Sequence, residues 1–98
     1  MKHVIVRPAA AADIEDAFQW YEARRPGLGD EFLLALNSTR TRVRDHPEAY
    51  PVLHRTTRRA LLPRRFPYGL FYRVYGEAIV IVACMHAKRD PQQWQRRS

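Results

Sequence analysis

The chain has 98 residues, a length that suits one domain spanning residues 1–98, because half of it would be too small to build a hydrophobic core. Apolar residues make up 46% and charged residues 28%, which excludes a disordered, collagenous or coiled-coil protein. The single cysteine, Cys84, excludes an internal disulfide and is typical of a reducing compartment. No apolar run is long enough to span a membrane, so we expect a cytoplasmic protein without a membrane partner.

The first half of the chain predicts a strand and a helical hairpin. Residues 2–7 have β-branched Val4 and Val6 at alternate positions, and Pro8 then opens a segment whose apolar residues recur at helical spacing. A Pro-Gly-rich stretch at residues 25–29 separates this segment from a second one of the same kind. The predicted elements are a strand at residues 2–7, helices at 9–23 and 30–44, and a proline-rich loop at 46–53.

The second half changes to strand character. Aromatic and β-branched residues flank Gly76-Glu77, a two-residue turn signal, and Asp90-Pro91 can cap and open a short helix. The predicted elements are an interrupted strand at residues 59–66, in which Pro63 confines at least that point to an edge or a bulge, strands at 68–75 and 78–86, and a helix at 91–97. The order β-α-α-β-β-β-α predicts an α+β fold, in which the helical hairpin packs on one face of a mainly antiparallel four-stranded sheet.

The positive charge is concentrated in the second half. The net charge is +7; residues 1–53 hold seven basic and eight acidic side chains, whereas residues 54–98 hold ten basic and only two acidic ones. A field of one sign attracts polyanions or acidic protein segments and accelerates association with them.

Several residues have a structural interpretation. Tyr68 and Tyr72 lie four apart on a predicted strand, so both should face the helices. Cys84 lies in an apolar strand and should be a core residue, and Trp94 should anchor the C-terminal helix. The four histidines lack the spacing of metal ligands, so we expect neither a metal nor a cofactor.

Short motifs that follow one another along nearly the whole chain resemble those of a known protein family. The motifs are Ala12-Asp13-Ile14, Trp20-Tyr21-Glu22, Pro26-Gly27-Leu28-Gly29, Phe32, His46-Pro47-Glu48-Ala49-Tyr50-Pro51, Arg65-Phe66-Pro67-Tyr68, Phe71-Tyr72-Arg73-Val74, His86, Lys88-Arg89-Asp90-Pro91 and Trp94. In this order the chain resembles the RelE/ParE superfamily, the toxins of type II toxin-antitoxin (plasmid stabilisation) modules. The resemblance implies a growth inhibitor that is neutralised by a cognate antitoxin, whose flexible acidic segment would suit the basic half of the chain.

One branch of the superfamily, the RelE-like enzymes, cleaves mRNA on the ribosome. Such chemistry needs a base, an acid and cations that stabilise the phosphate. For this branch the candidates are His86 as base or acid, Arg64, Arg65, Arg73, Lys88 and Arg89 around the phosphate, and Tyr68, Tyr72 and Trp94 for base stacking. Two departures count against cleavage: Gly69 replaces an arginine, and Trp94 replaces a tyrosine, that many of these nucleases carry.

The other branch, the ParE-like toxins, poisons DNA gyrase by binding and needs no catalytic residues. We slightly favour this target. The candidate target-binding residues are Arg58, Arg59, Arg64, Arg65, Arg73, His86, Lys88, Arg89 and Trp94. A degenerate toxin that acts only as an antitoxin-binding corepressor is a further alternative.

Overall fold

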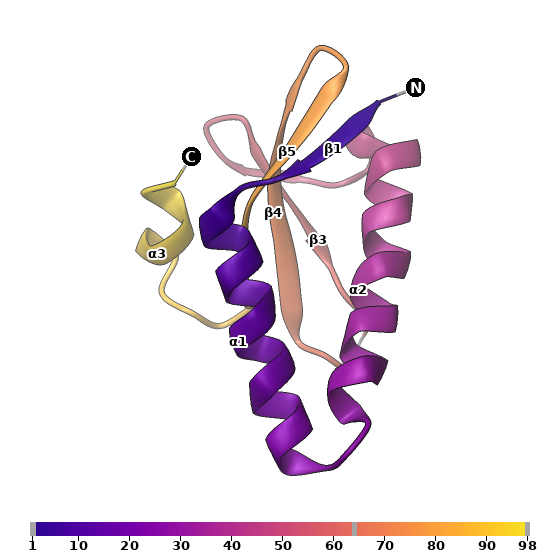
Figure 1. Cartoon of the computed structure of the whole chain (residues 1–98). Helices are drawn as coiled ribbons and strands as arrows, with labels where there is room; N and C mark the ends of the chain where they lie inside the picture. The colour runs from indigo at the N-terminus through magenta and orange to yellow at the C-terminus, as the bar shows by residue number, and fades with distance from the viewer. Residues whose placement is uncertain (1, 64, 98) are drawn as a thin grey trace.

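The computed structural model describes residues 2–63 and 65–97, and its ribbon is shown in Figure 1. The elements are β1 (His3–Val6), α1 (Pro8–Arg24), α2 (Leu28–Asp45), a 3-10 turn η1 (Pro47–Ala49), β2 (Val52–His54), β3 (Thr57–Leu61), β4 (Tyr68–Tyr75), β5 (Ala78–His86) and α3 (Gln92–Gln95). None of the helices in these residues is both long and apolar enough to cross a membrane.

The sheet confirms the α+β class and corrects the number of strands. It has five strands in the order β1-β5-β4-β3-β2, not the four expected. The extra strand, β2, lies within the predicted loop, because Pro51 precedes it and leaves Val52 free to pair with Arg58 of β3. Strand β1 pairs with β5 in parallel, and the other three pairs are antiparallel, so the sheet is mixed.

Several element boundaries also differ from the prediction. Strand β3 ends at Leu61, before Pro63, and not at residue 66, because proline cannot donate to a strand ladder. Helix α2 begins at Leu28 because the Glu22 carboxylate accepts hydrogen bonds from the N–H groups of Gly27 (3.0 Å) and Gly29 (2.9 Å), which closes the turn between the helices. Helix α3 is shorter than predicted, ending at Gln95.

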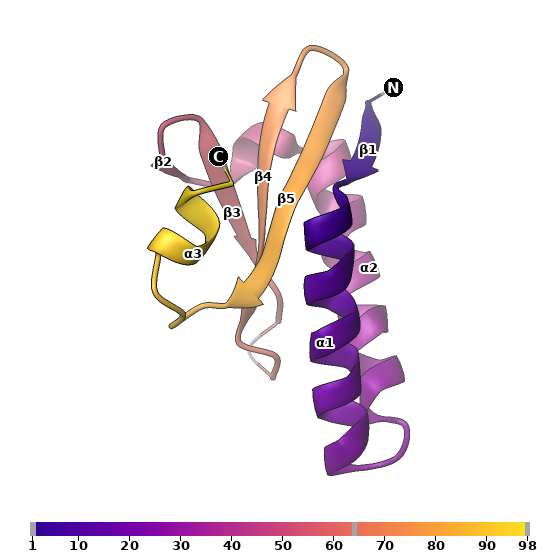
Figure 2. The ribbon, with the colours of Figure 1, turned by 60° about the vertical axis from the view of Figure 1, so that its left-hand side comes forward.

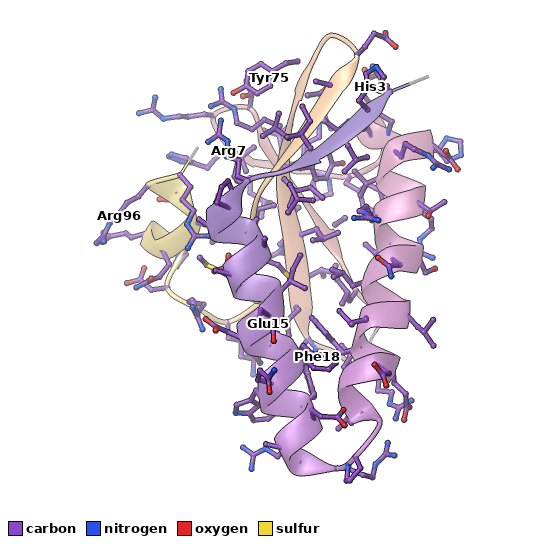
Figure 3. The ribbon with its side chains drawn as sticks, viewed as in Figure 1. His3, Arg7, Glu15, Phe18, Tyr75 and Arg96 are labelled. Carbon is purple, nitrogen blue, oxygen red and sulfur yellow. The ribbon has the colours of Figure 1, made fainter. Side chains whose placement is uncertain are left out.

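The turn between α1 and α2 depends on two glycines. Gly27 has a φ of +88°, in the left-handed region that favours glycine. A Cβ atom on Gly29 would lie 2.7 Å from the Phe18 ring, which Figure 3 shows between the two helices. The helices therefore approach closely at this point.

Figure 2 shows α1 and α2 on one side of the sheet and α3 on the other. The larger core lies under the helical hairpin and includes Phe32, Leu70 and Tyr72, whereas Trp94 of α3 packs with Phe71 in a smaller cluster on the opposite face. Both faces of the β5 run are thus covered over part of its length, as its continuous apolar sequence predicts.

The β4–β5 hairpin has the predicted connection. Tyr75 pairs with Ala78 across Gly76-Glu77, and Gly76 has a φ of +56°. Tyr72 faces the helices, as predicted, and its hydroxyl donates a hydrogen bond to the Pro47 carbonyl. Burial raises the pKa of Tyr72 to about 12, so the phenol remains a donor at neutral pH.

Candidate target-binding site

A hollow of about 530 Å³ gathers three of the predicted target-binding residues. It lies between the second half of α1, the segment that leads into β4 and the end of β5, which can be followed in Figure 1. We name it the arginine–aromatic hollow; its lining residues are Trp20, Tyr21, Arg65, Pro67, Tyr68, His86 and Arg89. The sheet register brings Tyr68 and His86 together, because they are directly paired across β4 and β5.

The imidazole of His86 has a defined orientation. Its Nδ1 atom accepts a hydrogen bond from the Lys88 N–H group (3.1 Å), and its ring meets that of Tyr68 edge-on at 5.6 Å. The His86 carbonyl also accepts the Arg89 N–H group (3.0 Å), which closes the turn after β5. Because Nδ1 is engaged, Nε2 is the nitrogen that can meet a ligand.

The guanidinium of Arg65 is held by a carboxylate at the edge of the hollow. Glu31 lies 2.6 Å from Arg65 and 3.0 Å from Arg25. The hydrogen bond from Arg25, together with Arg65, lowers the pKa of Glu31. The Arg65 side chain is 57% exposed, so this ion pair is weak and can be exchanged for an anionic ligand at little cost.

Aromatic rings form the remaining wall of the hollow. Trp20 is 51% exposed and is covered on one face by the Arg24 guanidinium, 4.0 Å from the ring centre. Burial raises the pKa values of Tyr21 and Tyr68, so both phenols keep their protons at neutral pH. The hollow thus combines cations with flat apolar surface.

A smaller hollow of about 160 Å³ adjoins the first and contains Asp13, which the sequence analysis assigned to no site. The Asp13 side chain is only 13% exposed; its carboxylate pairs with Arg97 and accepts the Cys84 N–H group (3.0 Å). Asp13 therefore ties the C-terminal segment to α1 and to β5. Cys84 is a buried core residue, as predicted, and burial raises its pKa to about 12.

The other predicted residues lie away from the hollow. Arg58 donates to the carbonyl groups of Tyr50 (2.6 Å) and Glu48 (3.4 Å), and so fixes the loop before β2. Arg73 donates to the Thr56 hydroxyl (3.0 Å) near the opposite end of β4. Five residues of strand separate it from Tyr68, a distance of about 17 Å.

Trp94 and Arg59 lie toward the opposite face of the sheet. Trp94 is 5% exposed and stacks on Phe71, with the ring centres 4.5 Å apart, so stacking on a base would require α3 to move. A Cβ atom on Gly69 would lie 2.9 Å from the Arg59 Cγ atom. The place where many nucleases of the superfamily carry an arginine is thus filled by the Arg59 stem. Lys88 is exposed beside His86, and Arg64 lies outside the described residues.

The sequence contained a weak signal for one residue of this site that we did not use. Trp20 lies outside the apolar positions that predict the buried face of the first helix, and aromatic residues are enriched at the centre of binding interfaces. Asp13 and Glu31 had no such signal, because their partners are distant or lie beyond a turn. Within the described residues, no group of three or more His, Cys, Asp or Glu side chains could hold a metal ion.

Comparisons with known proteins identify the family. The sequence matches the family described as "ParE toxin of type II toxin-antitoxin system, parDE" over residues 4–91. A solved structure titled "Chromosomal ParDE TA system from P. aeruginosa" has a similar fold, with a TM-score of 0.66 and 21% identity over 88% of this chain and 96% of that chain. No match was found among curated proteins. Because the family match covers most of the chain, this protein belongs to the ParE toxins of type II toxin-antitoxin systems.

Proposed function

We propose that this toxin acts by binding DNA gyrase through the arginine–aromatic hollow, without making or breaking a covalent bond. Membership of the family implies an antitoxin partner, whereas DNA gyrase as the target is our proposal. The proposal rests on the chemistry of the hollow and on the resemblance to the gyrase-binding branch of the superfamily.

The observation that carries the proposal is the shortage of proton-transfer groups. Of the described residues that line the hollow, His86 is the only imidazole, and the raised pKa values of Tyr21 and Tyr68 keep both phenols protonated at neutral pH. Cleavage of RNA by general acid-base catalysis needs two such groups on opposite sides of the phosphate. Arg73, a candidate phosphate ligand, lies at the other end of β4. Inhibition of gyrase by binding alone requires no proton-transfer group.

The hollow suits recognition of a protein or a protein–DNA surface. Arginine and aromatic side chains are the residues most often found at the centre of binding interfaces. Arg65 and Arg89 offer planar donors for carboxylates or phosphates, and Trp20 offers exposed ring surface beside them.

The experiment compares gyrase activity and translation in the presence of purified toxin. The unaltered toxin should inhibit DNA supercoiling by gyrase and leave in vitro translation intact. Arg65→Glu and Arg89→Glu should each weaken gyrase inhibition by about tenfold, since reversing a charge at an interface replaces attraction with repulsion. Arg42→Glu is the matched control: Arg42 is exposed on α2, where it donates to the Ser38 hydroxyl, and this change should have no effect.

A nuclease would give the opposite pattern. Discrete cuts in ribosome-bound mRNA that disappear in folded His86→Ala would refute the proposal. His86→Ala should instead weaken gyrase inhibition by about tenfold or less, as loss of one interface contact does, whereas loss of an essential general acid or base costs at least about 100-fold.

A further inference from the structure

We propose that the antitoxin binds the free edge of β1 with an extended, acidic segment that adds a sixth strand to the sheet. This inference rests on the toxin-antitoxin partnership and is independent of the gyrase target. It concerns the edge opposite β2, where Figure 2 shows β1 as the outermost strand.

The backbone of β1 has hydrogen-bonding groups that point away from the sheet. The N–H groups of His3 and Arg7 donate to β5 and its preceding turn, at the carbonyls of Glu77 (2.7 Å) and Ile81 (3.1 Å). Backbone groups of alternate residues point to opposite sides of a strand, so those of Val4 and Val6 point to the free edge. Within residues 2–63 and 65–97, β1 pairs with no strand other than β5.

Strand β1 is short, with four residues, but it lacks the other features that usually protect an edge strand. Proteins usually blunt an edge strand with proline, charge, a bulge or extreme shortness. From His3 to Val6 the strand has neither a proline nor a charged Lys, Arg, Asp or Glu, and Ile5 is 49% exposed. The Lys2 ammonium donates to the Gly76 carbonyl (2.8 Å), at the β4–β5 turn, and so is directed away from the edge.

The opposite edge of the sheet differs. Strand β2 has three residues, follows Pro51 and pairs irregularly with β3, with a register shift between Val52 and His54. Such a strand is a poor template for a regular ladder. Of the two edges, β1 is therefore the one that can accept another strand.

A basic hollow lies beside the β1 edge and indicates the charge of the partner. Its volume is about 250 Å³, and it is lined by Val4 of β1 and by Arg40, Thr41 and Arg44 of α2. Side chains of an added strand that point to the helix layer would enter this hollow. Acidic residues suit it, because Arg40 and Arg44 are both exposed cations.

The spacing of the two arginines matches that of a strand. Arg40 and Arg44 are one turn apart on α2, a rise of about 6 Å. Alternate residues of a strand are about 6.6 Å apart, so two acidic residues separated by one position can each reach one arginine. Arg44 already contacts Asp45 at 3.2 Å, but both side chains are about half exposed, and such a pair exchanges readily.

The test uses titration calorimetry to measure the affinity for the product of the neighbouring gene, which we expect to be the antitoxin. Arg40→Glu and Arg44→Glu should each weaken the complex by about tenfold at low salt, and the loss should shrink as salt is added. Arg42→Glu, on the same helix but outside the hollow, should change the affinity by less than twofold. Val4→Pro removes an outward N–H group and should also weaken binding by about tenfold.

Hydrogen exchange gives a second readout. The amides of Val4 and Val6 should become protected when the antitoxin binds, since each gains a strand partner. If Val4→Pro does not fold, as judged by circular dichroism, the arginine variants and the amide protection decide the question.

Three results would overturn the inference. If Arg40→Glu and Arg44→Glu left the affinity unchanged and the amides of Val4 and Val6 stayed unprotected, the antitoxin would bind at another surface, although the partnership itself would stand. Protection of the same amides in isolated toxin, rising with its concentration, would assign the edge to a second copy of the chain. Failure of the neighbouring product to bind the unaltered toxin would refute the partnership itself.

Discussion

Replacement of Trp94 by alanine should destabilise the protein through the loss of one anchor. Helix α3 has only four residues and cannot persist without tertiary packing. Its main apolar contact is the Trp94 ring, which is 5% exposed and stacks on Phe71 at 4.5 Å with an angle of 22° between the rings. Trp94→Ala would therefore leave Phe71 and Met85, on the same face of the sheet, partly open to water.

The magnitude follows from the buried area. A buried tryptophan removes about 150–250 Å² from water, which at about 25 cal/mol per Å² corresponds to about 4–6 kcal/mol as an upper bound. Because α3 can detach and relax, we expect a loss of about 3 kcal/mol in the free energy of unfolding, at the low end for such substitutions. For a domain of this size that loss lowers the Tm by about 12–24 °C.

The assay is thermal unfolding of the purified toxin followed by circular dichroism. Trp20→Ala is the matched control, because it removes the same side chain from a half-exposed site and should lower the Tm by only a few degrees. Equal Tm values for unaltered toxin and Trp94→Ala would refute the reasoning, since α3 would then contribute nothing to the folded domain.

Three further predictions follow from individual contacts. Asp13→Ala should lower the free energy of unfolding in urea by about 2 kcal/mol, because Arg97 and the Cys84 N–H group both lose their acceptor. If the effects of Asp13→Ala and Arg97→Ala were additive in the double variant, the two side chains would not be coupled and the reasoning would be wrong. Burial raises the pKa of Cys84 to about 12, so iodoacetamide should label this thiol only after unfolding. The free energy of unfolding should fall as the pH rises above the pKa of an exposed thiol, about 8.5, because the thiol then ionises in the unfolded chain but not in the folded one. Because the pKa of Glu31 is lowered, its contacts with Arg25 and Arg65 are fully present at any pH above the ordinary carboxyl pKa, and they are lost as the pH falls through the lowered pKa. An NMR titration should show the Arg65 guanidinium signals shifting in that pH range. The same signals should not shift in Glu31→Gln.

The sequence alone was sufficient for the helical hairpin, the β4–β5 hairpin and the α+β class. These features depend on neighbouring residues: apolar spacing in α1 and α2, the glycine-containing turn at Gly76, and the continuous apolar run of β5. Such signals lie within a few residues of each other, so they survive without knowledge of the rest of the chain. The motif order was also sufficient for the family.

Only the tertiary structure decided which distant residues meet. β1 and β5 are neighbours although the helical hairpin and the strands β2 to β4 separate them in sequence, and Asp13 pairs with Arg97 across 84 positions. The same holds for the site: Arg65, His86 and Arg89 come together because β4 starts where β5 ends, whereas Arg73, equally basic, is carried away along β4. Charge and residue type are local properties of a sequence, but proximity is set by strand register and helix packing, which depend on the whole core.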